Sequence, residues 1–562
     1  MSTTFSNFKH PYPVDKAFSR RAAYFCMEFG IDQALKIYSG GLGYLAGSHM
    51  RSAYELRQAM VGVGILWKYG YYDQTRRGDQ TMEAQFIEKN YSYLVDTGIK
   101  YKIDIDRHPV TVKAYYLPPE VFGTAPLFLL STDLPENDWL AQTICHRLYD
   151  SNVATKVAQC ILLGVGGAKL LDILGYQPDV YHLNEAHALP AAFYLYNQLG
   201  DMDAVRRKLI FTTHTPVEAG NEKHDIRLLD KLGFFAGLPM GKVRHLTGTD
   251  GDVFNHSLVA LRLAYLANGV SNIHGEVARK MWGPYTGICP ITHVTNAQNK
   301  KYWSDKIMDE AVANGDDATF LARKRWLKQK LFNLVADQTG KMFDPKALTI
   351  VWARRFAGYK RADLITRDLE RFERIIQNAA HPVQVIWAGK PYPTDYEAVS
   401  VFNGLVHLSK KYDNCAVVVG YELALSKKLK QGSDVWLNTP RIPREASGTS
   451  GMTAAMNASI NLSTFDGWIP EYAKHGENAF VVPEANPADP HHEVDQFDLN
   501  NILDVLEKEI IPTYYNKPQR WLQLVKDSMN QVVPFFDSDR MATEYYEKLY
   551  TKVPEAAVNK LM

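Results

Sequence analysis

Short apolar runs recur along the chain and alternate with longer stretches of helical periodicity. The clearest runs are residues 180–183, 209–212, 348–352, 383–387, 416–419 and 434–437. This alternation is typical of α/β proteins with parallel sheets. Polar or glycine residues follow each run, and ligands of open parallel sheets bind beyond the carboxyl ends of the strands. The pattern therefore predicts an α/β fold in which these loops share a cleft.

The runs form two sets, separated by a polar stretch around residues 297–345. A chain of 562 residues is too long for one hydrophobic core. We therefore expect two Rossmann-like α/β domains facing each other across a cleft. The predicted boundaries are 1–296 for the N-terminal domain and 297–530 for the C-terminal domain. Residues 531–562 are expected to form a C-terminal helix that packs back on the first domain.

Two segments of the first domain depart from the simple alternation. Residues 80–130 contain short alternating runs, such as Val110, Val112 and Ala114, which predict an antiparallel insertion. Residues 152–174 predict one long helix that contains Gly164–Gly167. These glycines lie inside the helix, not between a strand and a helix, so they indicate close packing and not a nucleotide-binding loop.

Composition narrows the possible partners and compartment. The net charge is +1, which implies no polyanion and hence no nucleic-acid partner. The five cysteines are an odd number without CxxC spacing, which argues against a disulfide framework or a zinc site. The N-terminal stretch has no signal-peptide pattern, and no apolar run is long enough to span a bilayer. We expect a cytoplasmic protein that does not contact a membrane.

The segment Glu445–Thr453 follows the run at 434–437 and leads into small residues that suit a helix. A helix start offers unpaired N–H groups to a phosphate or a sugar hydroxyl. The alternative is an ordinary helix capped by the side chain of Ser447 or Thr449. A loop rich in glycine, residues 39–43, also precedes a predicted helix, and a plain turn is the alternative there.

Four basic residues, Arg354, Arg355, Lys360 and Arg361, crowd the loop after the run at 348–352, and no acidic residue precedes Asp363 to balance them. The position favours a phosphate clamp, and a solvated basic face is the alternative.

Other polar residues add less to the chemistry. His214 could meet a sugar, although a structural role is more usual for a lone histidine. No metal cluster and no GxSxG motif stand out. The residues together predict a two-domain enzyme that handles a phosphorylated, polyhydroxylated substrate.

Several ordered motifs resemble the glycogen, starch and α-glucan phosphorylase family, glycosyltransferase family 35, which has the GT-B architecture. They are Met27–Phe29, Ser39–Gly43, Leu183–His187, Thr213–Pro216, His293–Asn296, Arg355–Arg361 and Glu445–Thr449. The resemblance covers most of the chain, from about residue 23 to 483. It implies a glucosyltransferase that retains anomeric configuration and acts on an α-glucan or oligosaccharide and a phosphorylated sugar donor. Homodimers are common in this family.

The resemblance also implies roles for single residues. His214, Arg355 and Lys360 match catalytic positions, the last two as ligands of the substrate phosphate. Gly40 and Gly41 match a phosphate-facing loop. The expected binders of the transferred glucosyl unit are Asn184, Glu445, Ser447, Gly448 and Thr449. No metal is implied.

The chain departs from the family at Thr453. The family has a lysine there, which forms a Schiff base with its cofactor, pyridoxal phosphate, and threonine has no amine for that bond. Three hypotheses follow. The chain uses a phosphorylated or nucleotide-diphosphate donor without covalent pyridoxal phosphate; or it is a phosphorylase that holds the cofactor non-covalently or works without it; or it is an inactive homologue that only binds glucan.

Overall fold

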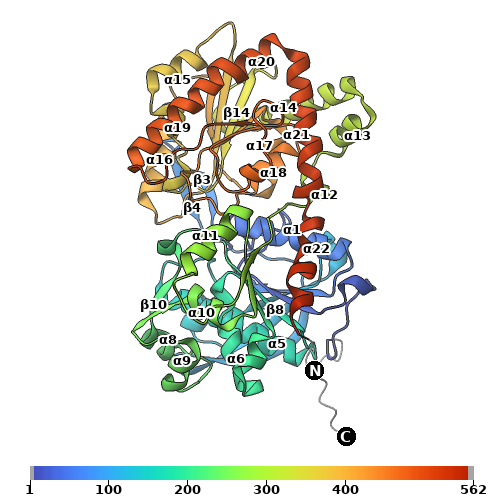
Figure 1. Cartoon of the computed structure of the whole chain (residues 1–562), viewed down its shortest axis with the longest axis vertical. Helices are drawn as coiled ribbons and strands as arrows, with labels where there is room; N and C mark the ends of the chain where they lie inside the picture. The colour runs from blue at the N-terminus through green and yellow to red at the C-terminus, as the bar shows by residue number, and fades with distance from the viewer. Residues whose placement is uncertain (1–4, 555–562) are drawn as a thin grey trace. The chain divides into compact units, whose positions relative to one another are not determined.

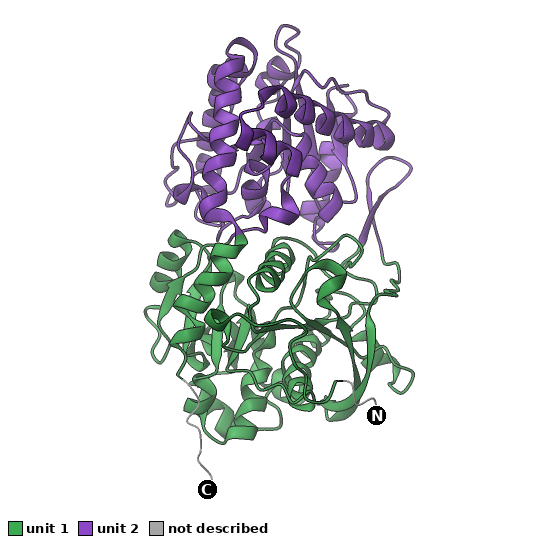
Figure 2. Ribbon diagram, turned by 90° about the vertical axis from the view of Figure 1, so that its right-hand side faces the viewer, with its two compact units in different colours: residues 1–72, 86–296, 538–562 green, residues 73–85, 297–537 purple. Residues whose placement is uncertain are grey.

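The computed structural model describes residues 5–554. The first four residues of the N-terminal stretch and the end of the 531–562 segment lie outside this range. The chain divides into two compact units. Unit 1 contains residues 1–72, 86–296 and 538–562, and unit 2 contains residues 73–85 and 297–537 (Figure 2). The structure thus groups 73–85 with the second unit and the chain after residue 537 with the first.

Unit 1 is built on a nine-stranded sheet in the order β13-β12-β9-β8-β1-β2-β7-β6-β5. Seven neighbouring strands, from β13 to β7, pair in parallel, whereas β7, β6 and β5 pair antiparallel. In sheet order the strands are Ile291–His293, Leu266–Gly269, Leu209–Thr212, Val180–Asn184, Ala22–Phe25, Met60–Ile65, Leu127–Ser131, His108–Leu117 and Val95–Ile105. The predicted antiparallel segment within residues 80–130 is confirmed. A separate pair, β10 (Lys223–Asp225) and β11 (Val253–Asn255), is also antiparallel.

Helices surround this sheet (Figure 1). They are α1 (Gly41–Glu55), α2 (Pro119–Phe122), α3 (Trp139–Thr143), α4 (Val153–Ile161), α5 (Gly167–Ile173), α6 (Pro190–Leu199), α7 (Met202–Arg206), α8 (Ile226–Leu232), α9 (Met240–Thr247), α10 (His256–Leu263), α11 (Asn272–Trp282) and α22 (Ser538–Lys548). The π-helix η2 (Leu162–Gly166) joins α4 to α5, so the predicted helix over 152–174 is continuous. By length and composition it could span a membrane, but 67% of its most apolar window is buried in the structure.

The glycines of this helix allow close packing, as predicted. A Cβ at Gly167 would lie 2.6 Å from the ring of Phe25, and one at Gly164 would lie 2.8 Å from the carbonyl oxygen of Ala188. Real Cβ atoms do not approach other atoms so closely. The neighbours could not move aside, because the interior is packed near crystal density. The helix is therefore a core element of unit 1.

The C-terminal segment, helix α22 followed by the short 3-10 helix η9 (Tyr550–Lys552), completes a buried polar network in unit 1. His182 of β8 lies 2.6 Å from the hydroxyl of Tyr550 and 2.7 Å from that of Thr212. Asn268 of β12 donates to the hydroxyl of Tyr545 at 3.2 Å. Buried polar groups are costly unless they are hydrogen-bonded, so these tyrosines satisfy the interior of the sheet.

Unit 2 is built on six parallel strands in the order β16-β15-β14-β17-β18-β19. In sheet order these are Cys415–Val418, Val383–Ala388, Leu348–Ala353, Val435–Asn438, Ile460–Ser463 and Phe480–Val481. The apolar runs after residue 345 thus form the strands that the sequence predicted. Central strands of parallel sheets are buried on both faces, which is why they read as continuous apolar runs.

The helices of unit 2 flank this sheet (Figure 1). They are α12 (Lys300–Trp303), α13 (Lys306–Asn314), α14 (Asp317–Thr339), α15 (Leu369–Ile376), α16 (Tyr396–Ser409), α17 (Leu423–Gly432), α18 (Ser450–Ala455), α19 (His491–Val505), α20 (Ile511–Asn516) and α21 (Pro518–Phe536). A second π-helix, η8 (Leu506–Ile510), joins α19 to α20.

A hairpin of β3 (Asp73–Arg76) and β4 (Met82–Gln85) belongs to unit 2, although the chain around it belongs to unit 1. The amide of Gln74 donates to the carbonyl oxygen of Gly389 at 2.9 Å and accepts from the N–H of Gly420 at 3.1 Å. These bonds join the hairpin to the loops after β15 and β16.

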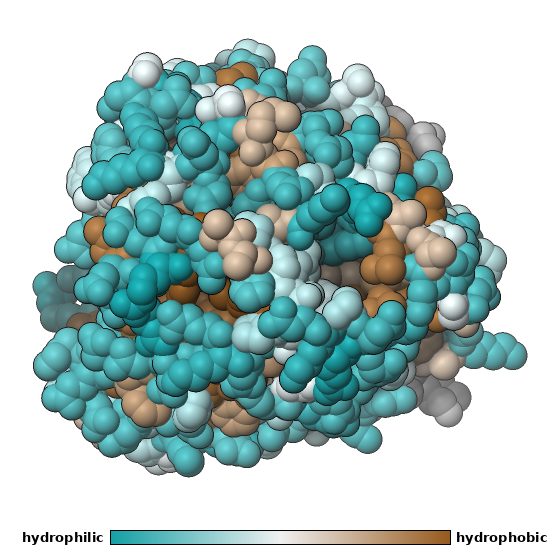
Figure 3. Space-filling view, turned by 90° about the horizontal axis from the view of Figure 1, so that it is seen from above, coloured by the Kyte–Doolittle hydropathy of each residue, from teal (hydrophilic) through white to brown (hydrophobic). Residues whose placement is uncertain are grey.

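The surface seen from above is mostly hydrophilic, with small separate apolar areas (Figure 3). The five cysteines are all buried and free. Within residues 5–554, no three His, Cys, Asp or Glu side chains are grouped so that they could hold a metal ion.

Candidate active site

The loop after β14 carries the four basic residues, which differ in burial and in hydrogen-bond partners. Arg354 is buried and donates to the carboxylate of Glu445 at 2.7 Å. Lys360 is also buried, and its Nζ atom lies 2.9 Å from the same carboxylate. Arg355 is exposed at the surface of unit 2. The carboxylate of Glu445 therefore lies between two buried cations, with a third cation close by in the sequence.

Arg361 does not belong to an open clamp. Its guanidinium is 0% exposed and donates to Asp498 at 2.6 Å and to Asp495 at 2.9 Å. It also donates to the carbonyl oxygen of Thr439 at 2.9 Å. The alternative of a solvated basic face does not hold for Arg354, Lys360 and Arg361. Each is buried and paired with a carboxylate from a distant part of the sequence, Glu445, Asp495 or Asp498. Arg361 anchors the loop that holds Lys360.

Glu445 is ionised in this surrounding. Burial alone would raise the pKa of its carboxyl, but Arg354 and Lys360 together lower that pKa to about 2. At neutral pH this carboxylate accepts hydrogen bonds and cannot supply a proton. It therefore suits a sugar hydroxyl better than the role of a general acid.

The residues after Glu445 leave two buried polar atoms without partners. Within the described part of the chain, neither Nη1 of Arg354 nor Oγ of Ser447 has a hydrogen-bond partner. Buried polar atoms are nearly always satisfied, so each such exception calls for an explanation. A bound ligand could supply a hydrogen-bond partner to each of these atoms. The sequence analysis named Arg354 only as one of the four basic residues of the candidate clamp, and could not tell it apart from its three neighbours.

Gly448 and Thr449 shape this loop. Gly448 has a φ of +77°, and a Cβ there would lie 3.0 Å from a guanidinium nitrogen of Arg354. Only glycine adopts this backbone freely and allows that approach. Thr449 precedes the first residue of α18 with helical dihedral angles and no side-chain hydrogen bond to the helix. The alternative that Thr449 caps this helix is therefore wrong. Ser447 lies two residues before Thr449, and its Oγ has no hydrogen-bond partner, so it does not cap the helix either.

A second loop holds the first in place. The Asp466 carboxylate accepts from the N–H groups of Glu445 and Gly467, both at 2.9 Å. The N–H of Trp468 donates to the carbonyl oxygen of Ser447 at 2.9 Å. Gly467 has a φ of +65°, and a Cβ there would lie 2.2 Å from the Ser447 oxygen. Sequence reasoning missed these residues, although Asp-Gly directly after an apolar run is a turn signal.

In unit 1 the glycine loop precedes α1. The Glu28 carboxylate accepts from the N–H of Ser39 at 2.6 Å and from that of Gly40 at 3.1 Å. The N–H of Gly40 is thus already engaged. A Cβ at Gly40 or Gly41 would meet nothing within 4 Å, whereas one at Gly43 would lie 2.6 Å from Glu28. Gly43 therefore serves packing, and Gly40 and Gly41 border open space.

Asn184 and His214, two predicted site residues, meet in unit 1. Oδ1 of Asn184 lies 2.7 Å from Nε2 of His214. Burial lowers the pKa of His214 to about 3, with smaller contributions from His274 and His187, so the imidazole is neutral. Since Nδ2 of Asn184 donates to Cys26 at 3.3 Å, Oδ1 accepts a hydrogen bond from the Nε2–H group of His214. The Nδ1 atom of His214 is then the acceptor of the ring.

Glu185 fixes the backbone of His214, and the sequence analysis did not name it as a site residue. Its carboxylate accepts from the backbone N–H of His214. Glu185 itself has a φ of +63°, which is unusual for a residue with a Cβ and is typical of functional sites. Burial raises the pKa of its carboxyl to about 7.

The sequence of the chain is similar to those of known proteins. A profile described as carbohydrate phosphorylase matches residues 293–482, which contain the basic loop and Glu445. The maltodextrin phosphorylase of Thermococcus litoralis is 35% identical, and the alignment covers 95% of this chain and 71% of that protein. The chain belongs to the carbohydrate phosphorylase family. A glycogen phosphorylase of Aquifex aeolicus is 30% identical, with 98% of this chain and 90% of that protein covered. An uncharacterized protein of Methanocaldococcus jannaschii is 45% identical, with 94% and 99% covered.

Membership of the carbohydrate phosphorylase family agrees with the fold. The two α/β units with large parallel sheets are those of the GT-B class. Similarity to glycogen and maltodextrin phosphorylases supports a glycosyltransferase of the α-glucan phosphorylase type.

The position of the family's cofactor lysine does not fit a covalently held pyridoxal phosphate. Thr453 is fully buried in α18, and its hydroxyl donates to the carbonyl oxygen of Ser450 at 3.0 Å. The side chain has no amine, so no imine can form there. In this phosphorylase-family chain Thr453 is part of the helix packing.

Asp466 gives the fold of this site a pH dependence. Burial, and next the charge of Glu445, raise the pKa of its carboxyl from 3.8 to about 7. An acid with a raised pKa in the folded state stabilises the fold fully below its ordinary pKa, and the contribution is lost as pH rises through about 7. We expect the free energy of unfolding to fall by up to about 1.4 kcal/mol per pH unit in this window.

Chemical unfolding of wild type and Asp466→Asn between pH 4 and 8 measures this contribution. In the variant, the free energy of unfolding is expected to depend less steeply on pH, because the amide does not titrate. The difference in slope should correspond to about one proton. Asp489→Asn, on the exposed loop before α19, is the matched control. Equal slopes for wild type and Asp466→Asn would show that Asp466 is ionised throughout.

Proposed function

We propose that the chain is a retaining α-glucosyltransferase that moves glucosyl units between a phosphorylated donor and an α-1,4-glucan. The observation that carries the proposal is the Glu445 carboxylate held between Arg354 and Lys360, beside the unpartnered Oγ of Ser447. The carboxylate can accept hydrogen bonds from sugar hydroxyls, and the Ser447 hydroxyl can donate one. The two cations supply positive charge for a phosphate. The family's relatives, which include a maltodextrin phosphorylase and a glycogen phosphorylase, support the choice of glucan.

In this proposal Lys360 and the exposed Arg355 bind the phosphate of the donor. Cations placed where negative charge develops lower the barrier more than any other single device in many enzymes. The bond between C1 of the sugar and the phosphate oxygen breaks while that charge grows. The acceptor hydroxyl attacks from the same face and gives its proton to the departing phosphate, so the configuration at C1 is retained.

The remaining residues bind the sugar in this scheme. Ionised Glu445 and the hydroxyl of Ser447 take sugar hydroxyls. Within unit 1, the neutral imidazole of His214 stays a predicted sugar-binding group. Gly40 and Gly41 stay the predicted phosphate-facing loop and border open space. The scheme needs no second catalytic carboxylate, which agrees with a Glu445 that stays ionised.

Two donors remain to be distinguished, glucose 1-phosphate and a nucleoside-diphosphate glucose. Thr453 favours a donor that does not depend on a covalent pyridoxal group, because that group has no amine to hold it. A nucleoside diphosphate brings its own second phosphate. A protein that only binds glucan would have no use for the two cations that Glu445 holds in place, so we rank that alternative last.

The test begins with the purified protein and ends with a donor screen. We expect no absorption at wavelengths longer than the protein's own ultraviolet band. After borohydride reduction, we expect no increase in the intact mass that a pyridoxyl adduct would cause. With maltoheptaose as acceptor, we expect longer α-1,4-linked products from one of the two donor classes, with the α-anomer seen by NMR. A β-anomeric product would exclude a retaining reaction. No product from either donor class would favour the inactive glucan-binding homologue.

A further inference from the structure

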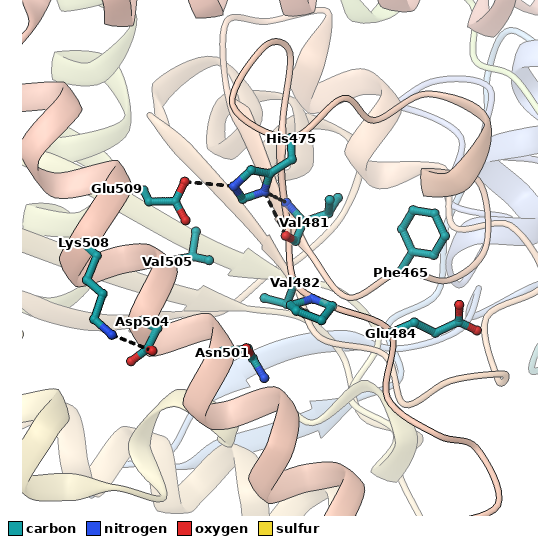
Figure 4. Close-up of a pocket in the computed structure, with 11 residues that line it drawn as sticks. Phe465, His475, Val481, Val482, Glu484, Asn501, Asp504, Val505, Lys508 and Glu509 are labelled. Atoms are coloured by element: carbon teal, nitrogen blue, oxygen red, sulfur yellow. Dashed lines mark hydrogen bonds and ion pairs between the residues drawn. The ribbon is translucent and has the colours of Figure 1, made fainter.

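A cavity of about 620 Å³ lies in unit 2 (Figure 4). One wall is helix α19 with its continuation η8, and the other is formed by the loops after β18 and β19. Its volume falls within the range of about 300–1,000 Å³ that is usual for small-molecule sites. None of the residues proposed above to bind donor or acceptor lines it.

The lining has an apolar part and a polar part. The apolar residues are Phe465, Val481, Val482, Pro483 and Val505. The polar residues are His475, Glu484, Asn501, Asp504, Lys508 and Glu509. A sugar ring has the same division, with an apolar C–H face and a rim of hydroxyl groups. An apolar pocket with a few fixed polar groups is the usual form of a selective binding site.

The charges of the cavity argue against an anionic ligand. Lys508 contacts Asp504 at 2.8 Å, and His475 contacts Glu509 at 2.8 Å. Both basic residues of the lining are thus paired, and Glu484 adds a further negative charge. A phosphate or nucleotide would meet more carboxylates than cations here, and like charges disfavour binding. The lining fits a neutral ligand with many hydroxyl groups.

The polar wall contains the π-helix η8, which carries Lys508 and Glu509. A π-helical turn inserts one residue more than an α-helix and often marks a functional site. Both side chains line the cavity, and that of Glu509 is 41% exposed, so its carboxylate can accept a hydrogen bond from a ligand. Asn501 lies one to two turns earlier on the same wall (Figure 4).

We propose that this cavity binds a neutral oligosaccharide and serves as a second glucan subsite on unit 2. The choice of an α-1,4-glucan as its ligand rests on the proposed function. The ring of Phe465 and the valines contact the C–H face of the sugar, and Asn501, Asp504 and Glu509 bind its hydroxyls. Phe465 directly precedes Asp466, whose carboxylate holds Glu445, so a bound chain also steadies the loop that binds the transferred sugar.

Affinity electrophoresis in gels that contain glycogen tests this subsite. The variant Asn501→Ala is compared with Asn500→Ala, which changes the preceding residue of α19, one that does not line the cavity. We expect Asn501→Ala to raise the apparent dissociation constant for glycogen about tenfold, which is what one lost hydrogen bond to a ligand typically costs. Asn500→Ala should migrate like the wild type. A second variant, Glu509→Gln, removes the charged acceptor and should also weaken binding.

The same gels are run in the Glu445→Gln background, and glucosyl transfer is measured separately. Retardation that falls with Asn501→Ala and Glu509→Gln but survives Glu445→Gln supports the subsite. Wild-type migration of both cavity variants, with transfer intact, overturns the subsite and leaves the proposed function standing. Absence of transfer contradicts the proposed function, and the gels still decide the subsite. A wild type that glycogen does not retard overturns the subsite in either case.

Discussion

Lys360→Ala is expected to lower glucosyl transfer by about 10²–10³-fold, the usual cost of removing one group that stabilises developing charge. Lys360 is buried beside Glu445, and in the proposed reaction it faces the phosphate. The loss should appear in kcat more than in KM, because the charge grows on the way to the transition state. Initial rates with the donor found in the screen measure it.

Controls separate this loss from unfolding. Arg354 still pairs with Glu445 in the variant, so we expect the circular dichroism spectrum of the wild type. Lys411→Ala removes an exposed lysine of unit 2 and should keep the wild-type rate. A Lys360→Ala enzyme with more than half the wild-type kcat would mean that Lys360 only positions Glu445.

Arg361→Ala is expected to lower the free energy of unfolding by about 3–5 kcal/mol, as for other buried pairs that lose one partner. The guanidinium is fully buried and holds Asp495 and Asp498. Without it, Asp498 remains buried without its cation, and burial then raises the pKa of that carboxyl further. The loop that carries Lys360 also loses its anchor, so activity should fall as well.

Arg367→Ala is the matched control for this loss. Arg367 also binds Asp495, but its side chain is 37% exposed and its other partner is Asp363. Exposed pairs contribute about 0–1 kcal/mol, so we expect a small change. Denaturant unfolding followed by tryptophan fluorescence compares the two variants. Similar losses for both would indicate that Arg361 is no more important than a surface pair.

The sequence predicted the strands β14 to β17 of unit 2, for a physical reason. The runs at 348–352 and 383–387 form β14 and β15, which are buried on both faces and so need apolar side chains throughout. Turns after these strands were visible as polar and glycine residues. The position of the site loops followed from the strand ends.

The pairing of charges could not be predicted in the same way. Arg354 and Glu445 lie 91 positions apart, and Arg361 and Asp498 lie 137 apart. Neither spacing has a periodic signature, because such pairs depend on how β14, β17 and α19 pack. The four basic residues of this loop therefore looked alike in the sequence. In the structure Arg361 anchors the loop, Arg354 and Lys360 bind Glu445, and Arg355 is exposed.

The grouping of residues 73–85 was equally hidden. The hairpin is attached to unit 2 by the amide of Gln74, which bonds to backbone groups of Gly389 and Gly420. Backbone partners leave no trace in the sequence, since every residue has an N–H or a carbonyl group. The absence of an amine at Thr453, in contrast, can be read directly from the sequence.

The order in which the chain enters the two units determines which unit can be completed first during synthesis. The chain passes from one unit to the other after residues 72, 85, 296 and 537. The last segment brings Tyr545 and Tyr550 to the polar network of His182 and Asn268. Unit 2 is therefore complete on the ribosome while unit 1, made mostly before it, still lacks its final helix. A chain that stops after residue 537 would contain all of unit 2 but would leave the polar network of unit 1 incomplete.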